Sequence, residues 1–164
     1  MTNTEDNFNY NDENLIEERL KNSATYIRDN ILKKPILEQK FPKSNVAVAE
    51  VQIGDVIFYL GTPSNKKTLL PIPIAKSKGG QFEPKPHPRT QQPTDAHAEY
   101  KILSAIAKYL EMNYNLDVEG YLYLYTELHP CPSCEDVIEQ FKDKFRKINV
   151  KVFWDYPDAP KVKW

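Results

Sequence analysis

The stretch GYLYLYTEL, residues 120–128, alternates tyrosine and leucine from Tyr121 to Tyr125. Successive side chains of a strand point to opposite faces, so a strand of this composition is apolar on both faces and has to be covered on both. Apolar residues recur every three or four positions before it, in residues 102–110, and after it, in residues 137–148, which indicates helices. We therefore expect this strand to lie in the centre of a sheet that helices cover on both faces.

The remaining segments continue this alternation of helix and strand. Residues 11–34 have helical spacing, with Asn11 or Asp12 as the expected N-cap, and NVAVAEVQIGDVIFYLG predicts a hairpin that turns at Gly54 and Asp55. VKVFWDY, residues 150–156, predicts a further strand. This order of elements predicts the α/β class and a three-layer α/β/α sandwich with an N-terminal helix. The central mixed sheet is expected to have about five strands.

The length of 164 residues suits a single domain. Residues 1–10 are polar and acidic and are expected to be disordered, and residues 11–164 are expected to form one domain with its core at residues 45–164. No stretch reaches the roughly 18 apolar residues of a membrane-spanning helix, so no membrane partner is expected. The two cysteines lie too close together to staple a secreted fold, and the polar start does not resemble a signal peptide, so a cytoplasmic fold is expected.

The charges are unevenly distributed, although the net charge is only −1. Residues 1–20 carry six acidic side chains and one basic one, whereas residues 62–94 carry six basic side chains and one acidic one. The second segment also holds seven of the thirteen prolines, which predicts a long irregular loop. Such a loop is either an ordinary solvated segment or one that contacts phosphates.

Both cysteines lie in PCPSC, residues 130–134, where the central strand gives way to the next helix. His97 and Glu99 lie at the start of the preceding helix, so two helix N-termini can bring an imidazole and two thiols to one point. Positive helix ends favour the thiolate, which is the form that binds metal. Three ligands, His97, Cys131 and Cys134, predict a zinc site of the catalytic type, which keeps one position open.

Two other histidines and one carboxylate bear on this predicted site. His129 lies two residues before Cys131, too close to fold back onto the same metal, and His87 in the proline-rich loop is harder to exclude as a fourth ligand. Glu99 is offset from His97, which suits a general acid and base beside an activated water. The Cys-x-x-Cys spacing also occurs in redox proteins, where His97 and Glu99 would have no role, and in structural zinc sites.

The residues HAE at 97–99 and PCPSC at 130–134 resemble the zinc deaminase signature His-x-Glu…Pro-Cys-x-x-Cys. The resemblance implies a cytidine-deaminase-like fold, zinc held by the histidine and both cysteines, and the glutamate as the catalytic residue. Within that superfamily, TELHPCPSCEDVIEQF and NVAVAEV are most similar to deaminase domains of bacterial polymorphic toxins. This likeness implies a secreted effector that deaminates nucleic acid in the cytoplasm of a target cell and has an immunity protein as its partner.

A more local likeness concerns VFWDYPD, which resembles the loop that lines the target base in APOBEC-type cytidine deaminases. Carried over by position, this resemblance implies that Trp154 packs against the flipped base and that Asp155 and Tyr156 select its neighbour. The backbone N–H of Ala98 and the backbone carbonyl of His129 would hold the pyrimidine edge. After this loop the chain is expected to depart from the APOBEC pattern, because the remaining residues of this sequence leave no room for a further helix and parallel strand.

The predicted reaction is hydrolytic deamination of cytosine to uracil in nucleic acid, with single-stranded DNA favoured because an unstacked base costs least to extract. Deamination of RNA, or of free cytidine or another small nucleoside or base, and a zinc-stabilised binding module without activity are the alternatives. Salt dependence separates polynucleotide from nucleoside substrates, since contacts with phosphates weaken steeply as salt rises.

Overall fold

The structure is a computed structural model that describes residues 12–32, 45–63, 76, 80–84, 97–128, 130 and 132–156. Residues 1–10, for which disorder is predicted, lie outside these ranges, as do most of the proline-rich loop and residues 157–164. None of the helices in the described ranges has the length and apolar character that crossing a membrane requires.

The elements follow one another in the predicted order. Helix α2 (Glu13–Ile27) continues into a π-helical turn, η1 (Arg28–Leu32), and the hairpin strands are β1 (Val46–Ile53) and β2 (Val56–Pro63). Helix α3 (Ala98–Asn113), strand β3 (Gly120–Leu128), helix α4 (Pro132–Lys144) and strand β4 (Ile148–Tyr156) complete the described chain.

The strands form one mixed sheet in the order β2-β1-β3-β4. Strand β1 pairs antiparallel with both of its neighbours, and β3 pairs parallel with β4. A parallel pair needs a crossover connection, and α4 provides it. The α/β class and the mixed sheet are confirmed, but the predicted count of about five strands is wrong, because the described part of the chain has four.

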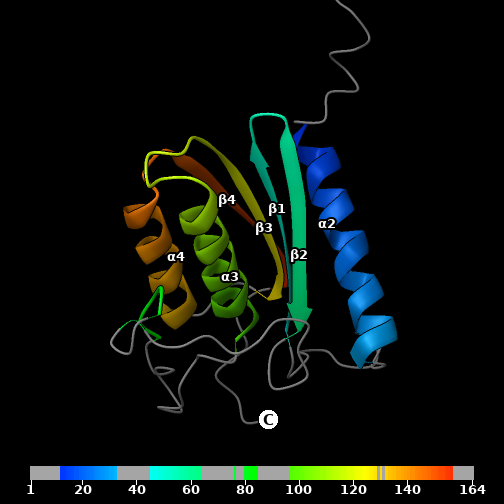
Figure 1. Cartoon of the computed structure of the whole chain (residues 1–164). Helices are drawn as coiled ribbons and strands as arrows, with labels where there is room; N and C mark the ends of the chain where they lie inside the picture. The colour runs from blue at the N-terminus through cyan, green and yellow to red at the C-terminus, as the bar shows by residue number, and fades with distance from the viewer. Residues whose placement is uncertain are drawn as a thin grey trace, which may run out of the picture.

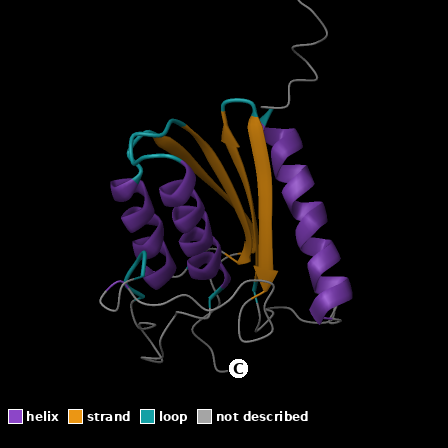
Figure 2. Cartoon of the chain, in the orientation of Figure 1, coloured by secondary structure: helices purple, strands orange, loops and turns teal. Residues whose placement is uncertain are grey.

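Helices cover both faces of the sheet (Figure 1). Helices α3 and α4 lie on one face and α2 lies on the other, so the layers are helix, sheet and helix (Figure 2). Two clusters of buried side chains match the two interfaces. The larger cluster joins α3 and α4 to the sheet, and the smaller one joins α2 to it through Ile16, Leu20, Ala24 and Ile27.

The central place of β3 follows from its sequence. Leu122 and Leu124 are fully buried on the side of α3 and α4, and Tyr123 and Tyr125 are buried on the side of α2, so the predicted burial of both faces is present. Tyr121 differs, because it stacks on Tyr123 with ring centroids 6.1 Å apart but remains 47% exposed. Large buried side chains on both faces fix the register of β3, since a slip by one residue would exchange the two sets.

Helix α2 begins after Asp12, whose side chain accepts a hydrogen bond from the Asn14 backbone N–H at 2.8 Å. An aspartate at this position satisfies one of the N–H groups that the first turn leaves unpaired. Of the two N-caps that the sequence offers, Asp12 is therefore the one used, and the described helical residues run on to Leu32.

Two arginines fasten the α2 layer to carboxylates of the sheet. The Nη2 atom of Arg19 lies 3.0 Å from each carboxylate oxygen of Glu50 in β1. Arg28 donates from Nε to Oε2 of Glu127 in β3 at 2.7 Å, and from Nη2 to Oε1. Glu50, Arg28 and Glu127 are all buried, and charges at such positions are tolerated only when they are paired.

Lys101 lies on the buried side of α3 and makes the stability of the fold depend on pH. Its Nζ donates to the Pro63 carbonyl at 2.7 Å, and burial lowers the pKa of Lys101 from an ordinary 10.5 to about 8. A lysine whose pKa is lower in the folded protein destabilises the fold below that pKa, and the cost disappears as pH rises toward the unfolded value. Relative to a Lys101→Met variant, the wild type should therefore gain up to about 3 kcal/mol between pH 8 and 10.5.

Chemical denaturation of the wild type and of Lys101→Met across this pH window measures the difference in unfolding free energy. Lys108→Met is the matched control, because it removes an exposed lysine from the same helix and so shows how the loss of a lysine side chain affects stability without burial. A Lys101→Met difference that stays constant over the window would contradict the effect of burial on Lys101.

Candidate metal and catalytic site

The candidate site lies where helix α3 begins. His97 is the N-cap residue, with an extended backbone, and its carbonyl accepts a hydrogen bond from the Lys101 N–H at 3.1 Å. Ala98 and Glu99 follow in the first turn; Ala98 is fully buried, and Glu99 is only 3% exposed. The start of a helix has unpaired N–H groups and a positive end, so it favours anionic groups placed near it.

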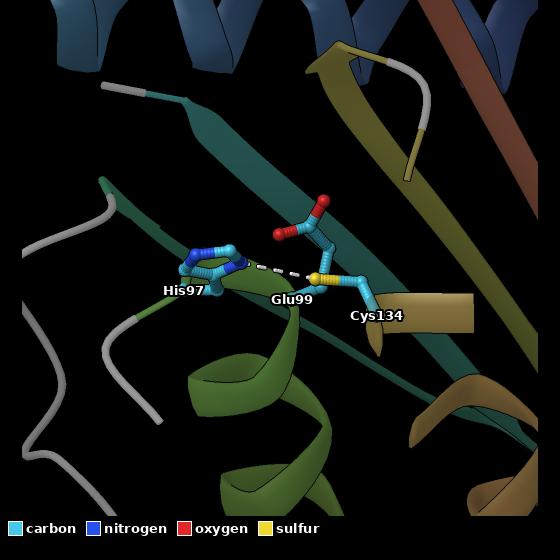
Figure 3. Close-up of side chains that lie close together, drawn as sticks. All are labelled: His97, Glu99 and Cys134. Atoms are coloured by element: carbon cyan, nitrogen blue, oxygen red, sulfur yellow. Dashed lines mark hydrogen bonds between the residues drawn. The ribbon is translucent and has the colours of Figure 1, made fainter. Parts of the chain in front are cut away.

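Cys134 reaches the same place from the start of helix α4. In Figure 3, the His97 ring, the Glu99 carboxylate and the Cys134 sulfur lie close together between the ends of α3 and α4. The Nδ1 atom of His97 is 3.2 Å from Sγ of Cys134, and one ligand atom from each of the three residues lies within 4.8 Å of the others. Cys134 is 2% exposed and His97 is half-buried. The structure thus brings three of the four residues of the predicted metal and catalytic group together.

The geometry and chemistry of this group fit zinc. Zinc bonds of about 2.3 Å to sulfur and about 2.0–2.1 Å to nitrogen, at a tetrahedral angle, separate the two ligand atoms by about 3.6 Å. The Nδ1 to Sγ distance of 3.2 Å is close to that separation. Imidazole nitrogen and thiolate sulfur are also the ligand types that zinc binds in proteins, so His97 and Cys134 would hold the ion.

Cys131, the other predicted sulfur ligand, lies outside the described residues, and so do His129 and His87. In the sequence, Cys131 directly precedes α4, and Cys134 is the third residue of that helix. Side chains three positions apart at a helix start lie on one side. The ligand role of Cys131 and the role of the His129 carbonyl stay predictions.

Two residues that the sequence did not single out contact the Glu99 carboxylate. Asn45 donates from Nδ2 to Glu99 Oε2 at 3.1 Å, and Thr126 Oγ1 lies 3.1 Å from the same oxygen. A hydroxyl has one proton, so Thr126 donates either to Glu99 or to the Leu128 carbonyl, which is 3.0 Å away. The sequence holds one signal for Thr126, which ends the apolar run of GYLYLYTEL. It holds none for Asn45, because an asparagine before a strand is ordinary turn composition.

Trp154 lies on the same face of the sheet as Thr126. The two residues are register partners in the parallel pair of β3 and β4, and such partners point to the same side. Val150 and Val152, at the preceding alternate positions, pack against the cluster beneath α3 and α4. Trp154 is 45% exposed, so part of an indole ring is open to solvent one strand away from the contact between Thr126 and Glu99.

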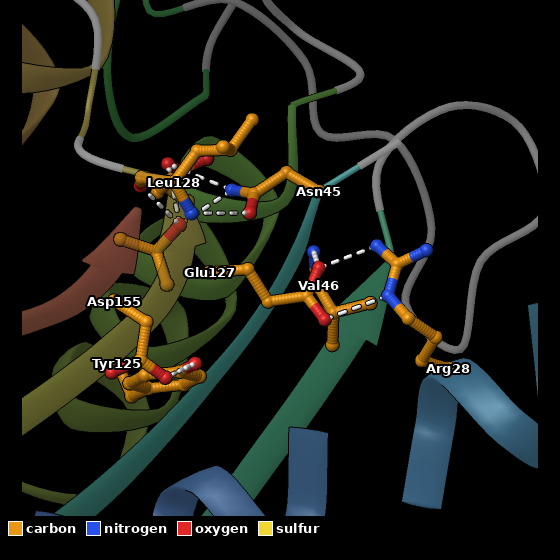
Figure 4. Close-up of polar contacts among 9 residues, drawn as sticks. Arg28, Asn45, Val46, Tyr125, Glu127, Leu128 and Asp155 are labelled. Carbon is orange, nitrogen blue, oxygen red and sulfur yellow. Dashed lines mark hydrogen bonds and ion pairs between the residues drawn. The ribbon is translucent and has the colours of Figure 1, made fainter. Parts of the chain in front are cut away.

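Asp155 points to the opposite face, toward α2. Its Oδ2 accepts a hydrogen bond from the Tyr125 hydroxyl at 2.7 Å (Figure 4), and its Oδ1 lies 2.9 Å from Nζ of Lys21. Neighbouring residues of a strand point to opposite faces, so the side chains of Asp155 and Trp154 lie on opposite sides of the sheet. The structure does not bring Asp155 to the His97 group. Tyr156 is the last residue of β4, and selection of a neighbouring base by Asp155 and Tyr156 stays a prediction.

Residues 79–155 match a family model of the toxin-deaminase type, described as the BURPS668_1122 family of deaminases. The matched segment contains the whole His97, Glu99 and Cys134 group. A comparison with curated proteins finds no match. The family match confirms the predicted likeness to toxin deaminase domains. The match thus identifies residues 79–155 as a segment of the toxin-deaminase type.

Proposed function

We propose that this deaminase converts cytosine to uracil by hydrolysis, with zinc as its cofactor and with nucleic acid, above all single-stranded DNA, as its substrate. The observation that carries the proposal is the approach of His97 and Cys134 to 3.2 Å beside the buried Glu99 carboxylate, inside the segment that matches the family. The arrangement His-x-Glu…Pro-Cys-x-x-Cys is the signature of deaminases that act on bases.

The residues of the group have separate tasks in this proposal. His97 and Cys134, with Cys131, would hold the zinc ion, which when bound supplies a Lewis acid that makes water nucleophilic near neutral pH. The Glu99 carboxylate takes one proton from the attacking water and passes it to the ring nitrogen, and it then moves the second proton, from the hydroxyl formed on the ring carbon, to the departing amine. The oxygen of water replaces the exocyclic nitrogen on the ring carbon, and ammonia leaves.

Two features favour a polynucleotide over a free nucleoside. Trp154 exposes part of its ring on the sheet face that carries Thr126, and unpaired bases stack on such aromatic surfaces. Residues 62–94 carry six basic side chains against one acidic one, a charge that suits a phosphate backbone. Single-stranded DNA is favoured because its bases have no pairing partner to lose when one enters the site.

The proposal is tested by incubating the purified protein with labelled single-stranded DNA, double-stranded DNA, RNA and free cytidine, and by measuring the deaminated product. Product should form fastest from single-stranded DNA, and the rate should fall steeply between low and moderate salt. Faster turnover of free cytidine without salt dependence would make the chain a nucleoside deaminase instead. No product from any of the four substrates would contradict the proposed reaction.

Truncation of Trp154 should weaken substrate binding. Stacking of a base on an aromatic side chain contributes about 1–3 kcal/mol, so Trp154→Ala should raise KM for single-stranded DNA roughly 5- to 150-fold, with a smaller change in kcat. Trp154→Phe keeps an aromatic face and should stay close to the wild type. Tyr121→Ala is the matched control, because Tyr121 is exposed to a similar degree but lies at the far end of β3 from Thr126. Equal KM values for the two alanine variants would argue against a base contact at Trp154.

The family match also supports a biological role, and we extend the proposal to it. The chain would act as a secreted effector in the cytoplasm of a target cell, and an immunity protein would neutralise it. Expression of the wild type inside a bacterium should then stop growth and convert cytosine to uracil in its DNA, whereas expression of Glu99→Gln should do neither. Equal growth of the two strains would contradict the effector role.

A further inference from the structure

Asn45 directly precedes β1 and joins the start of that strand to the end of β3. Its Oδ1 accepts a hydrogen bond from the Leu128 backbone N–H at 3.1 Å (Figure 4). This contact lies beyond the last register pair of the two strands, Ala47 with Thr126. Because the amide oxygen is used by a backbone N–H, the amide nitrogen is turned toward the interior, where Glu99 lies.

The Asn45 amide nitrogen has two protons and finds two acceptors. Nδ2 is 3.1 Å from Glu99 Oε2 and also donates to Thr126 Oγ1, which is itself 3.1 Å from Glu99 Oε2. The amide nitrogen of Asn45, the hydroxyl of Thr126 and Oε2 of Glu99 therefore all lie within hydrogen-bond distance of one another. Thr126 is fully buried, Glu99 is 3% exposed and Asn45 is 9% exposed, so bulk water does not compete for these contacts. A buried polar group with its bonding satisfied is held rigidly.

We infer that Asn45 and Thr126, here called the Glu99 clamp, are positioning residues that fix the Glu99 carboxylate for proton transfer. A glutamate side chain has several rotatable bonds, whereas a proton carrier has to lie within hydrogen-bond reach of both its donor and its acceptor. The clamp sets the direction of the carboxylate relative to His97 and Cys134. The inference rests on the proposed role of Glu99, and Asn45 lies outside the segment 79–155 that matches the family.

A purely structural role of the clamp would have different consequences. If Asn45 and Thr126 only closed the end of the sheet, their loss would lower the melting temperature and the zinc content along with activity. Positioning residues act on kcat while KM, zinc content and stability stay nearly unchanged. Residues that support the groups around a metal in this way typically change activity about 10- to 100-fold when they are replaced.

Thr126→Val and Thr126→Ser are the decisive pair of variants. Valine keeps the shape of threonine but lacks the hydroxyl, so Thr126→Val should lower kcat about 10- to 100-fold, with unchanged KM for single-stranded DNA and unchanged zinc content. Thr126→Ser restores the hydroxyl and should recover most of the lost kcat. Asn45→Asp keeps an acceptor for the Leu128 N–H but loses the donor to Glu99, so it should lower kcat as well.

Glu127→Gln is the control at the same end of the sheet. Glu127 points to the α2 face, where it pairs with Arg28 and accepts the Val46 N–H at 3.1 Å. The variant leaves the charge of Arg28 buried beside a neutral amide, so it should lower the melting temperature and leave kcat of the folded protein near the wild type. Thr126→Val should show the reverse pattern.

A crystal structure of Thr126→Val, compared with one of the wild type, tests the clamp without any activity assay. The Glu99 carboxylate should leave its position while His97 and Cys134 stay in place. A carboxylate that stays in place in both Thr126→Val and Asn45→Asp would overturn the inference, and so would an unchanged kcat or an effect on KM alone. If the wild type itself forms no product, the proposed function fails, but the crystal structures still decide whether the clamp fixes Glu99.

Discussion

Replacement of Glu99 by glutamine is expected to lower kcat for deamination by roughly 10²–10⁴-fold, while zinc content and melting temperature stay those of the wild type. Glutamine keeps an oxygen that can accept hydrogen bonds from Asn45 Nδ2 and Thr126 Oγ1, each of which is 3.1 Å from the Glu99 carboxylate. Its amide cannot take up and release the proton that hydrolysis moves from water to the leaving amine. Product formation from single-stranded DNA, measured beside metal analysis and thermal melting of the same preparations, checks this result.

Glu111→Gln is the matched control, because it makes the same substitution toward the other end of helix α3. Hydrogen bonds from Gln81 and Lys144 lower the pKa of Glu111, and Lys144 Nζ lies 2.9 Å from its carboxylate. This variant should deaminate at the rate of the wild type. Full activity of Glu99→Gln would contradict the proton-carrier role, and loss of zinc together with activity would mean that Glu99 chiefly maintains the metal site.

Replacement of Arg28 by methionine is expected to lower the unfolding free energy by about 3–5 kcal/mol. Arg28 and Glu127 are 2% and 3% exposed, and Nε of Arg28 donates to Oε2 of Glu127 at 2.7 Å. Burial raises the pKa of Glu127, and the hydrogen bond and charge of Arg28 oppose that rise. Without Arg28 the carboxylate would lie between α2 and the sheet without its cation. Urea denaturation at neutral pH measures the loss.

Acidification should reverse part of this loss. A carboxyl whose pKa is raised in the folded protein favours folding below its unfolded pKa, and that contribution is lost as pH rises through the folded value. Removal of Arg28 raises the pKa of Glu127 further, so the deficit of Arg28→Met relative to the wild type should shrink as pH falls and Glu127 takes up a proton. A deficit that does not vary with pH would contradict an unpaired carboxylate as its cause.

A double variant, Arg28→Met with Glu127→Gln, separates lost charge pairing from lost packing. Glutamine keeps an acceptor for the Val46 N–H, so the double variant should recover most of the lost stability at neutral pH. Lys151→Met is the surface control, because Lys151 and its partner Glu13 are both more than half exposed and lie 3.8 Å apart, and it should change stability little. A double variant as unstable as Arg28→Met would show that the charge is not the cause.

The layers of the fold and the approach of His97 to Cys134 could be predicted because their signals are periodic or local. Alternating tyrosine and leucine in β3 indicates a strand buried on both faces, and HAE and PCPSC lie at helix starts, where spacing fixes the direction of side chains. The predicted strand count was wrong because no apolar run in the sequence supported a fifth strand. That strand was expected only because the expected fold has one.

The residues around Glu99 and beneath α2 could not be predicted, because each is a single polar residue with a remote partner. Asn45 contacts Glu99 across 54 positions of the chain, and Arg28 contacts Glu127 across 99. Neither contact produces a periodic pattern, and the partners meet only because α3 and α2 pack against the two faces of the sheet. A polar Thr-Glu pair at the end of an apolar strand signals that partners exist, but not which residues they are.

The placement of Asp155 depends on how far β4 continues. The strand runs without interruption to Tyr156, so Trp154 and Asp155 point to opposite faces. A loop that began at Asp155 would let both residues face the target base, as the APOBEC resemblance implies. The sequence VFWDYPD does not distinguish these two courses of the backbone, because aromatic and polar residues suit both a strand end and a loop.

Metal analysis of the purified protein, with deamination measured on the same sample, tests the central claim most directly. If His97 and Cys134, with Cys131, hold zinc beside Glu99, the wild type should carry zinc in nearly equimolar amount and Cys134→Ser much less. A chelator should abolish deamination, and added zinc should restore it. Deamination by protein that carries no transition metal, or a crystal structure in which Cys131 and Cys134 form a disulfide, would contradict the claim.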